Sequence, residues 1–106
     1  MKVALTNDNL DSLINGSGIN IILVGSSSCN PCKAIGNRID EFLKDNKDIN
    51  ALYAPIECFR EYFASLTILS VPTVLVYVNG RLQIKESGYF SLDKILNSII
   101  RIKELM

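Results

Sequence analysis

The sequence predicts an α/β fold in which a central mixed β-sheet carries helices on both faces. Strand-like and helix-like segments alternate along the first two thirds of the chain, as they do in sheets with helices packed against them. Two apolar runs rich in β-branched residues, Ile19–Val24 and Thr73–Val78, resemble strands covered on both faces. Asn79-Gly80 after the second run is the strongest two-residue hairpin signal, so the sheet includes an antiparallel pair.

The amino-terminal part of the chain predicts a strand, a helix and a second strand. Lys2–Leu5 forms a short leading strand. Asn7 or Asp8 can cap a helix that ends at Gly16-Ser17-Gly18. The apolar positions of this helix are Leu10, Leu13 and Ile14. Ile19–Val24 is the strand that follows.

The middle of the chain predicts a helix, a strand and another helix. One apolar helical face follows a Ser-rich turn and consists of Cys32, Ile35, Ile39, Phe42 and Leu43. Ile49–Ile56 has the composition of a strand. Cys58–Leu66 is a helix, because its large apolar side chains recur at i, i+3, i+4 and i+7: Phe59, Tyr62, Phe63 and Leu66.

The last third predicts a hairpin and a final helix. Pro72 opens the strand Thr73–Val78, and Arg81–Ser87 is the return strand. Ser91 can cap a helix whose inward residues are Leu92, Ile95, Leu96 and Ile99. The predicted order is β-α-β-α-β-α-β-β-α. Because the chain has no repeat, linker or low-complexity tract, we expect one domain over residues 1–106.

Composition narrows the possible functions. The formal net charge is +0, which removes any electrostatic case for nucleic acid or an anionic membrane as the main partner. There is no histidine, so His-based catalytic triads and His-ligated zinc are excluded. The sequence offers neither a signal-peptide pattern nor an apolar run long enough to span a membrane. We therefore expect a cytoplasmic protein in a reducing compartment, with no cofactor.

Two of the three cysteines carry the chemistry that the sequence suggests. Cys29 and Cys32 are separated by two residues, a spacing typical of redox or metal chemistry in a reducing compartment. Pro31 suits the first turn of a helix, which places Cys29 at the helix N-terminus. The helix dipole there stabilises a thiolate, and in such motifs a thiol pKa can fall from about 8.5 to between about 3.5 and 7.5. Cys29 is then the exposed nucleophile and Cys32 the more buried resolving thiol.

Four segments together resemble the thioredoxin family. Cys29-Asn30-Pro31-Cys32-Lys33 resembles its active site, which is typically Cys-Gly-Pro-Cys-Lys. Ser70-Val71-Pro72-Thr73 resembles its cis-proline loop and Asn79-Gly80 its hairpin. Gly88 stands where the family has a glycine before its last helix. The resemblance covers essentially the whole chain and implies the thioredoxin-like fold.

The resemblance also implies an enzyme activity, thiol–disulfide exchange through a reversible Cys29–Cys32 disulfide. It implies support of the site by Asn30, Pro31 and Lys33 and substrate binding by Val71, Pro72 and Gly88. The implied partners are proteins or small molecules that contain a disulfide, and a flavoprotein thioredoxin reductase that donates electrons. We expect a monomer that binds neither nucleic acid nor membrane.

Several positions depart from the family pattern. Leu23 stands where thioredoxins usually carry a buried aspartate that helps to deprotonate the resolving cysteine, and Tyr53 stands at its lysine partner. Ser28 replaces an aromatic residue before the first cysteine, so we expect a smaller and more polar docking surface. Asn30 replaces a glycine, and Gly36-Asn37 replaces an alanine-proline pair. These differences suggest a protein with its own partners rather than the general cellular reductant.

Other interpretations remain open at this stage. Glu57 or the Tyr53 hydroxyl can replace the missing aspartate through water. We expect Cys58 to be a half-buried filler at a helix start, with a modifiable thiol as the alternative. Competing functions are a glutathione-coupled, glutaredoxin-like enzyme, a redox sensor that does not turn over, and a zinc module. A zinc module would use the three cysteines and Glu57.

Overall fold

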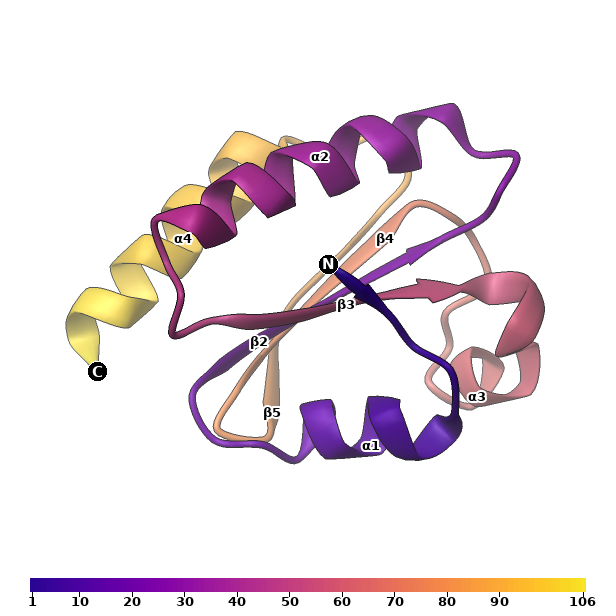
Figure 1. The fold of residues 1–106 in the computed structure, drawn as a ribbon, viewed down its shortest axis with the longest axis horizontal. Coiled ribbons are helices and arrows are strands. Elements are labelled where there is room, and N and C mark those ends of the chain that lie inside the picture. The colour runs from indigo at the N-terminus through magenta and orange to yellow at the C-terminus, as the bar shows by residue number, and fades with distance from the viewer.

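Five strands form one sheet in a computed structural model that describes residues 1–106 (Figure 1). In chain order the strands are β1 (Lys2–Val3), β2 (Ile19–Gly25), β3 (Asn50–Pro55), β4 (Thr73–Val78) and β5 (Arg81–Ser87). Their order in the sheet is β1-β3-β2-β4-β5. The pairs of β3 with β1 and β2 are parallel, whereas β4 pairs antiparallel with β2 and β5. The predicted mixed sheet is confirmed.

Helices cover both faces of this sheet. They are α1 (Asn7–Ile14), α2 (Asn30–Lys44), α3 (Arg60–Ser65) and α4 (Leu92–Leu105), with a short 3-10 helix η1 (Ile56–Cys58) before α3. In Figure 1, α2 and α4 lie on one side of the sheet and α1 and α3 on the other. None of these helices combines the length and apolarity that crossing a bilayer requires.

The central strand β2 separates two hydrophobic cores. All seven of its residues are buried, because helices cover both of its faces. Ile22 and Val24 pack into the core beneath α1 and α3, together with Leu10 and Phe63. The alternate residues Ile21 and Leu23 pack into the other core, beneath α2 and α4. Ile39 of α2 and Ile95 and Ile99 of α4 also belong to this second core.

The start of α1 differs from the prediction by one residue. Thr6, rather than Asn7 or Asp8, caps the helix. The Thr6 hydroxyl accepts a hydrogen bond from the Asn9 N–H at 3.2 Å, and the Asn9 side-chain oxygen accepts one from the Thr6 N–H at 3.3 Å. This reciprocal capping box satisfies two backbone donors at once, which explains why Thr6 is the N-cap rather than a later residue.

The helix predicted over Cys58–Leu66 is also shorter than expected. Cys58 closes the 3-10 turn η1, and α3 begins only at Arg60. Phe59 lies between the two with φ −136° and ψ 33°, outside the helical region. Its ring is buried in the core beneath α1 and α3. The apolar spacing from Phe59 to Phe63 is therefore real, but the anchored Phe59 interrupts the helix.

Candidate active site

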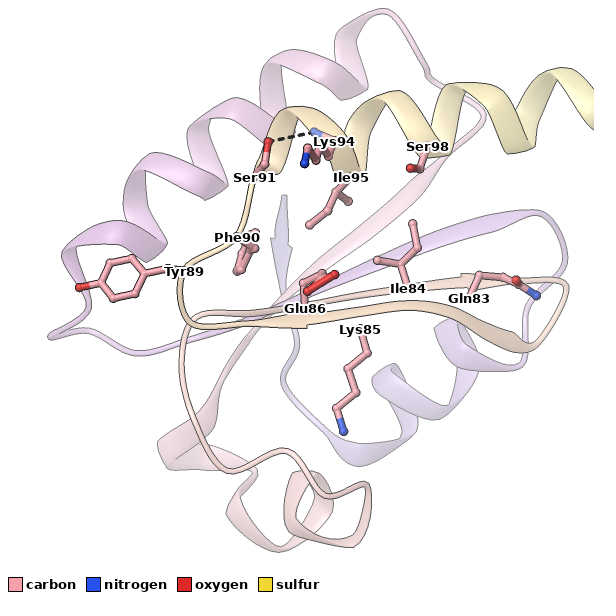
Figure 2. A pocket seen from close by; sticks show the side chains of 10 residues that line it. All are labelled: Gln83, Ile84, Lys85, Glu86, Tyr89, Phe90, Ser91, Lys94, Ile95 and Ser98. Atoms are coloured by element: carbon pink, nitrogen blue, oxygen red, sulfur yellow. Dashed lines mark hydrogen bonds between the residues drawn. The ribbon is translucent and has the colours of Figure 1, made fainter.

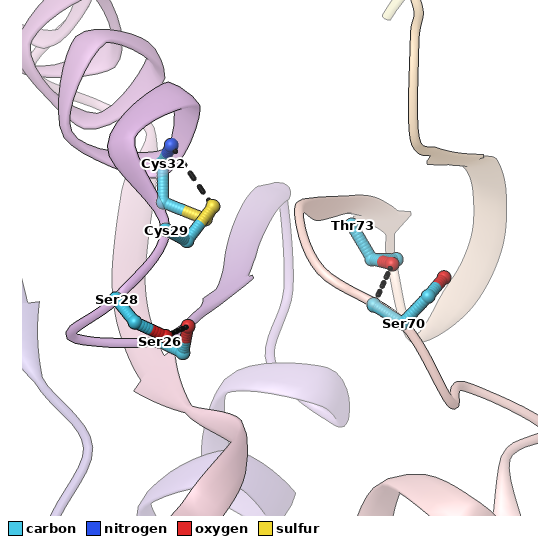
Figure 3. The surroundings of a disulfide bond; sticks show 6 residues. All are labelled: Ser26, Ser28, Cys29, Cys32, Ser70 and Thr73. Atoms are coloured by element: carbon cyan, nitrogen blue, oxygen red, sulfur yellow. Dashed lines mark hydrogen bonds between the residues drawn. A yellow bond between two sulfur atoms is a disulfide. The ribbon is translucent and has the colours of Figure 1, made fainter.

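The two cysteines of the motif lie where β2 leads into α2. β2 ends at Gly25, three serines turn the chain, and Cys29 is the residue that caps α2. Cys29 and Cys32 form a disulfide with their Cα atoms 5.3 Å apart. Figure 3 shows this disulfide at the start of α2, across from the loop that carries Ser70 and Thr73. Cys29 is half-buried, whereas only 3% of Cys32 is exposed. The predicted contrast in exposure is confirmed.

The first turn of helix α2 directs one backbone N–H at the Cys29 sulfur. Cys29 Sγ accepts a hydrogen bond from the Cys32 N–H at 3.2 Å. Pro31 is within the first turn, where it removes no intrahelical hydrogen bond. The positive end of the helix dipole also lies at this sulfur. The arrangement therefore favours negative charge on Cys29 whenever the disulfide is reduced.

Three loops that are far apart in the sequence meet at this end of the sheet. The Thr73 hydroxyl donates to the Ser70 carbonyl at 2.7 Å, and it also lies 2.8 Å from the Ser87 hydroxyl. The Gly88 N–H donates to the Pro72 carbonyl at 3.0 Å. The Val71–Pro72 peptide bond is cis, and Gly88 has a φ of 75° that favours glycine. These contacts fix the Ser70–Pro72 loop against the segment that follows β5.

A cavity of about 360 Å³ lies between these loops and Cys29. Its lining residues come from all three segments: Ser26, Ser28, Cys29, Pro31, Val71, Pro72, Gly88 and Tyr89. The structure thus brings the three predicted substrate-binding residues, Val71, Pro72 and Gly88, to the same cavity as the predicted nucleophile. Asn30 is exposed on the first turn of α2 and does not line it.

Cys32 borders a different cavity, of about 390 Å³, on its other side. Lys33 and Tyr53 also line it, and Asp40 is its only carboxylate. The Tyr53 ring and the Cys32 sulfur both lie close to the backbone of Gly25. A Cβ added to Gly25 would lie 2.8 Å from Tyr53 Cε1 and 3.1 Å from Cys32 Sγ. The ring and the resolving sulfur are therefore packed around Gly25, which has no side chain.

The buried position at which the family usually has a carboxylate is apolar in this chain. Leu23 is fully buried in the core beneath α2 and α4. Tyr53 lies beside it on β3, and the pKa of the Tyr53 phenol is raised, chiefly by burial and secondarily by the nearby Glu57 carboxylate. Tyr53 is thus a neutral phenol near neutral pH. It can donate a hydrogen bond in this cavity but carries no charge.

The expectation of a half-buried Cys58 is wrong. Cys58 is a free, exposed thiol at the end of η1. It is exposed because Ile56 and Phe59 are both buried in the core, which leaves the two side chains between them, Glu57 and Cys58, on the outer surface. The structure gathers no three Cys, Asp or Glu side chains into a group that could hold a metal ion. The ligand set of the alternative zinc module, Cys58 and Glu57 with the Cys29–Cys32 pair, is therefore not assembled.

Sequence reasoning did not identify Tyr89 as part of the site. Tyr89 follows Gly88, lines the Cys29 cavity and is completely exposed, at 107% of the reference value. It also borders a second cavity of about 520 Å³ between β5 and α4 (Figure 2), which contains no cysteine. The only available signal was its position next to Gly88, since its approach to Cys29 depends on the tertiary fold.

Comparisons with known proteins agree with this geometry. The thioredoxin family model matches residues 1–101. Thioredoxin from Mycoplasmoides gallisepticum is 24% identical over 95 residues, which cover 90% of this chain and 95% of that protein. Thioredoxin from Staphylococcus saprophyticus is 28% identical over 88 residues, covering 82% and 84% of the two chains.

Solved structures show the same fold. The solution structure of oxidised thioredoxin from Plasmodium falciparum superimposes with a TM-score of 0.83 at 22% sequence identity, over 96% of this chain and 97% of that chain. The family match spans nearly the whole sequence, and the two cysteines of the motif are joined at the helix N-terminus. The chain therefore belongs to the thioredoxin family and is a thiol–disulfide oxidoreductase.

Proposed function

We propose that this chain reduces disulfides on protein substrates, with Cys29 as the nucleophile and Cys32 as the resolving thiol. The observation that carries the proposal is the contrast between the two sulfurs. Cys29 lines an open cavity beside Val71 and Pro72, whereas Cys32 is almost completely buried behind it. A substrate disulfide can therefore approach Cys29 but not Cys32.

The proposed reaction has two exchange steps. The Cys29 thiolate attacks one sulfur of the substrate disulfide, so a Cys29–substrate bond forms and the substrate S–S bond breaks. The released substrate sulfur takes up a proton. Cys32 then loses its proton and attacks Cys29, which forms the Cys29–Cys32 disulfide and releases the second substrate thiol. Two electrons pass from the dithiol to the substrate.

Three other groups have supporting roles in this proposal. Pro31 and the first turn of α2 hold the amides that stabilise the Cys29 thiolate. The backbone of Val71 and Pro72, with Gly88 alongside, holds an extended substrate segment next to Cys29. Lys33 is exposed beside the Cys32 cavity, where its positive charge favours the thiolate over the thiol.

The first test is the reduction potential of the Cys29–Cys32 pair, measured by equilibration in defined thiol–disulfide buffers followed by alkylation. A value near about −270 mV, as in thioredoxin, supports a disulfide reductase. A value well above about −200 mV indicates an oxidant or a redox sensor instead. If no reversible disulfide forms between the two cysteines, the proposal is wrong.

Variants at the three cysteines separate their roles. Cys29→Ser removes the nucleophile and should abolish insulin reduction. Cys32→Ser should trap a mixed disulfide on Cys29, which mass spectrometry detects as an adduct. The matched control is Cys58→Ser, which removes an exposed thiol outside the site and should retain the wild-type rate.

We infer further that a flavoprotein thioredoxin reductase supplies the electrons and that the chain has its own partners. The replacement of a buried carboxylate by Leu23 supports separate partners, because the release of mixed disulfides then lacks a base at this buried position. Insulin reduction with a general thioredoxin reductase tests both ideas. Rates as high as those of ordinary thioredoxins would contradict the restriction to its own partners, and turnover with glutathione alone would favour a glutaredoxin-like enzyme.

The remaining expectations are part of the same proposal. We propose a single domain over residues 1–106, acting as a monomer in the cytoplasm. The two cores on one continuous sheet support a single domain. A free Cys58 in a chain that also has a reversible disulfide fits a reducing compartment. Sedimentation and fractionation of cells test the monomer and the location.

A further inference from the structure

We propose that Tyr89 determines which disulfides this chain reduces, by packing its ring on an apolar side chain next to the substrate cysteine that Cys29 attacks. This inference rests on the proposed function. It concerns the choice of substrate rather than the exchange chemistry.

The Tyr89 ring is placed by residues on either side of it. Gly88 is tied to the Pro72 carbonyl by a 3.0 Å hydrogen bond, and Phe90 packs against the core beneath α2 and α4. The backbone of Tyr89 is therefore fixed at both ends while its ring lies in solvent. Figure 2 shows this ring pointing away from Phe90, Ile84 and Ile95, out of the cavity between β5 and α4.

The same ring is the only aromatic group that lines the Cys29 cavity. Ser28, which precedes Cys29, has no apolar surface to offer a substrate. On the Cys29 side of the cavity the apolar surface is that of Pro31, and on the opposite rim it comes from Tyr89 with Val71 and Pro72.

The absence of charged groups in the cavity indicates which substrate side chains it can bind. None of its eight lining residues carries a charged side chain, so it offers no ion pair to an acidic or basic neighbour of the substrate cysteine. A charged side chain there would lose hydration without gaining a partner. A leucine or phenylalanine would instead bury area against the ring. Tyrosine loses little conformational freedom in such a contact because only two side-chain torsions must be fixed.

Two synthetic peptide disulfides test the inference. They share one sequence and differ only in the residue beside the attacked cysteine, which is leucine in one and serine in the other. The wild-type chain should reduce the leucine peptide with a kcat/KM about threefold to tenfold higher than the serine peptide, the range expected for one aromatic–apolar contact. Tyr89→Ala should bring this ratio close to one, and Tyr89→Phe should retain it.

Two controls separate specificity from damage to the enzyme. The Cys29–Cys32 reduction potential should be the same in Tyr89→Ala and wild type, because the hydrogen bond to Cys29 Sγ comes from the Cys32 N–H and not from Tyr89. Leu105→Ala removes a side chain that is 82% exposed at the far end of α4 and should leave the peptide ratio unchanged. A ratio near one in the wild type, or a ratio unaffected by Tyr89→Ala, overturns the inference while leaving the proposed function intact. Failure of the wild type to reduce either peptide contradicts both.

Discussion

At the scale of single residues, the lack of a side chain at Gly25 leaves room for both the Tyr53 ring and the Cys32 sulfur. Gly25→Ala would put a methyl group 2.8 Å from Tyr53 Cε1 and 3.1 Å from Cys32 Sγ, closer than real contacts of this kind. Neither neighbour is the free end of a flexible chain, so the backbone must shift. We expect a loss of about 1–3 kcal/mol in the free energy of unfolding, measured by urea denaturation of the oxidised protein.

The matched control for this prediction is Gly36→Ala in the middle of α2. A methyl group at Gly36 would meet only Leu23 Cδ2 and Met1 Cε, both at 3.6 Å, which is ordinary contact. Because alanine favours a helix interior more than glycine, we expect a gain of about 0.5–1 kcal/mol. The two substitutions should therefore have opposite signs, and a gain in both variants would show that space at Gly25 is not limiting.

At the scale of elements, α2 depends on Cys29 for its first hydrogen bond as well as for chemistry. The Cys32 N–H donates to Cys29 Sγ, and a serine hydroxyl at the same position can accept that bond. In reducing buffer, Cys29→Ala should be less stable than Cys29→Ser by about 1 kcal/mol. Both variants lack the nucleophile, so denaturation curves rather than activity distinguish them. Equal stabilities would mean that water caps the helix.

Elements were predictable from the sequence where periodicity and burial agree. β2 and β4 are continuous apolar runs, and both lie at the centre of the sheet. Element ends were less predictable because they depend on side-chain bonds and on packing. The N-cap of α1 is Thr6 because its hydroxyl accepts a hydrogen bond from the Asn9 N–H. Phe59 interrupts a pattern that reads as one helix because its ring is needed in the core.

At the scale of the whole molecule, the site assembles from segments that the sequence separates by up to sixty residues. Cys29 and Pro72 could be placed together in advance because each lies in a motif with a known arrangement. Tyr89 could not, because its approach to Cys29 is created by the Gly88–Pro72 hydrogen bond and the inward Phe90. Cys58 was misplaced for a related reason, since the orientation of a short 3-10 turn is set by its buried neighbours.

The tyrosines make the whole fold sensitive to alkali. Burial raises the pKa of Tyr53, Tyr62 and Tyr77 above the usual value of about 10. For Tyr62 a hydrogen bond also contributes, because its hydroxyl donates to Asp11 Oδ1 at 2.6 Å and links α3 to α1. The folded state therefore holds these phenolic protons more tightly than the unfolded chain does. The resulting stability is complete below pH 10 and is lost as the pH rises above it.

Tyr62→Phe tests this linkage at its strongest point. We expect the wild-type Tm to fall more steeply between pH 9.5 and about pH 11.5 than the Tm of Tyr62→Phe, which has no phenol to ionise at this position. At pH 7 the variant should be less stable by about 0.5–1.5 kcal/mol, because the bond to Asp11 is missing. Absorbance at 295 nm, followed through the same titration, shows whether tyrosinate appears together with unfolding. Parallel Tm profiles for the two proteins would show that the Tyr62–Asp11 contact between α3 and α1 does not cause the loss of stability at alkaline pH. Ionisation of Tyr53 and Tyr77 would then account for that loss.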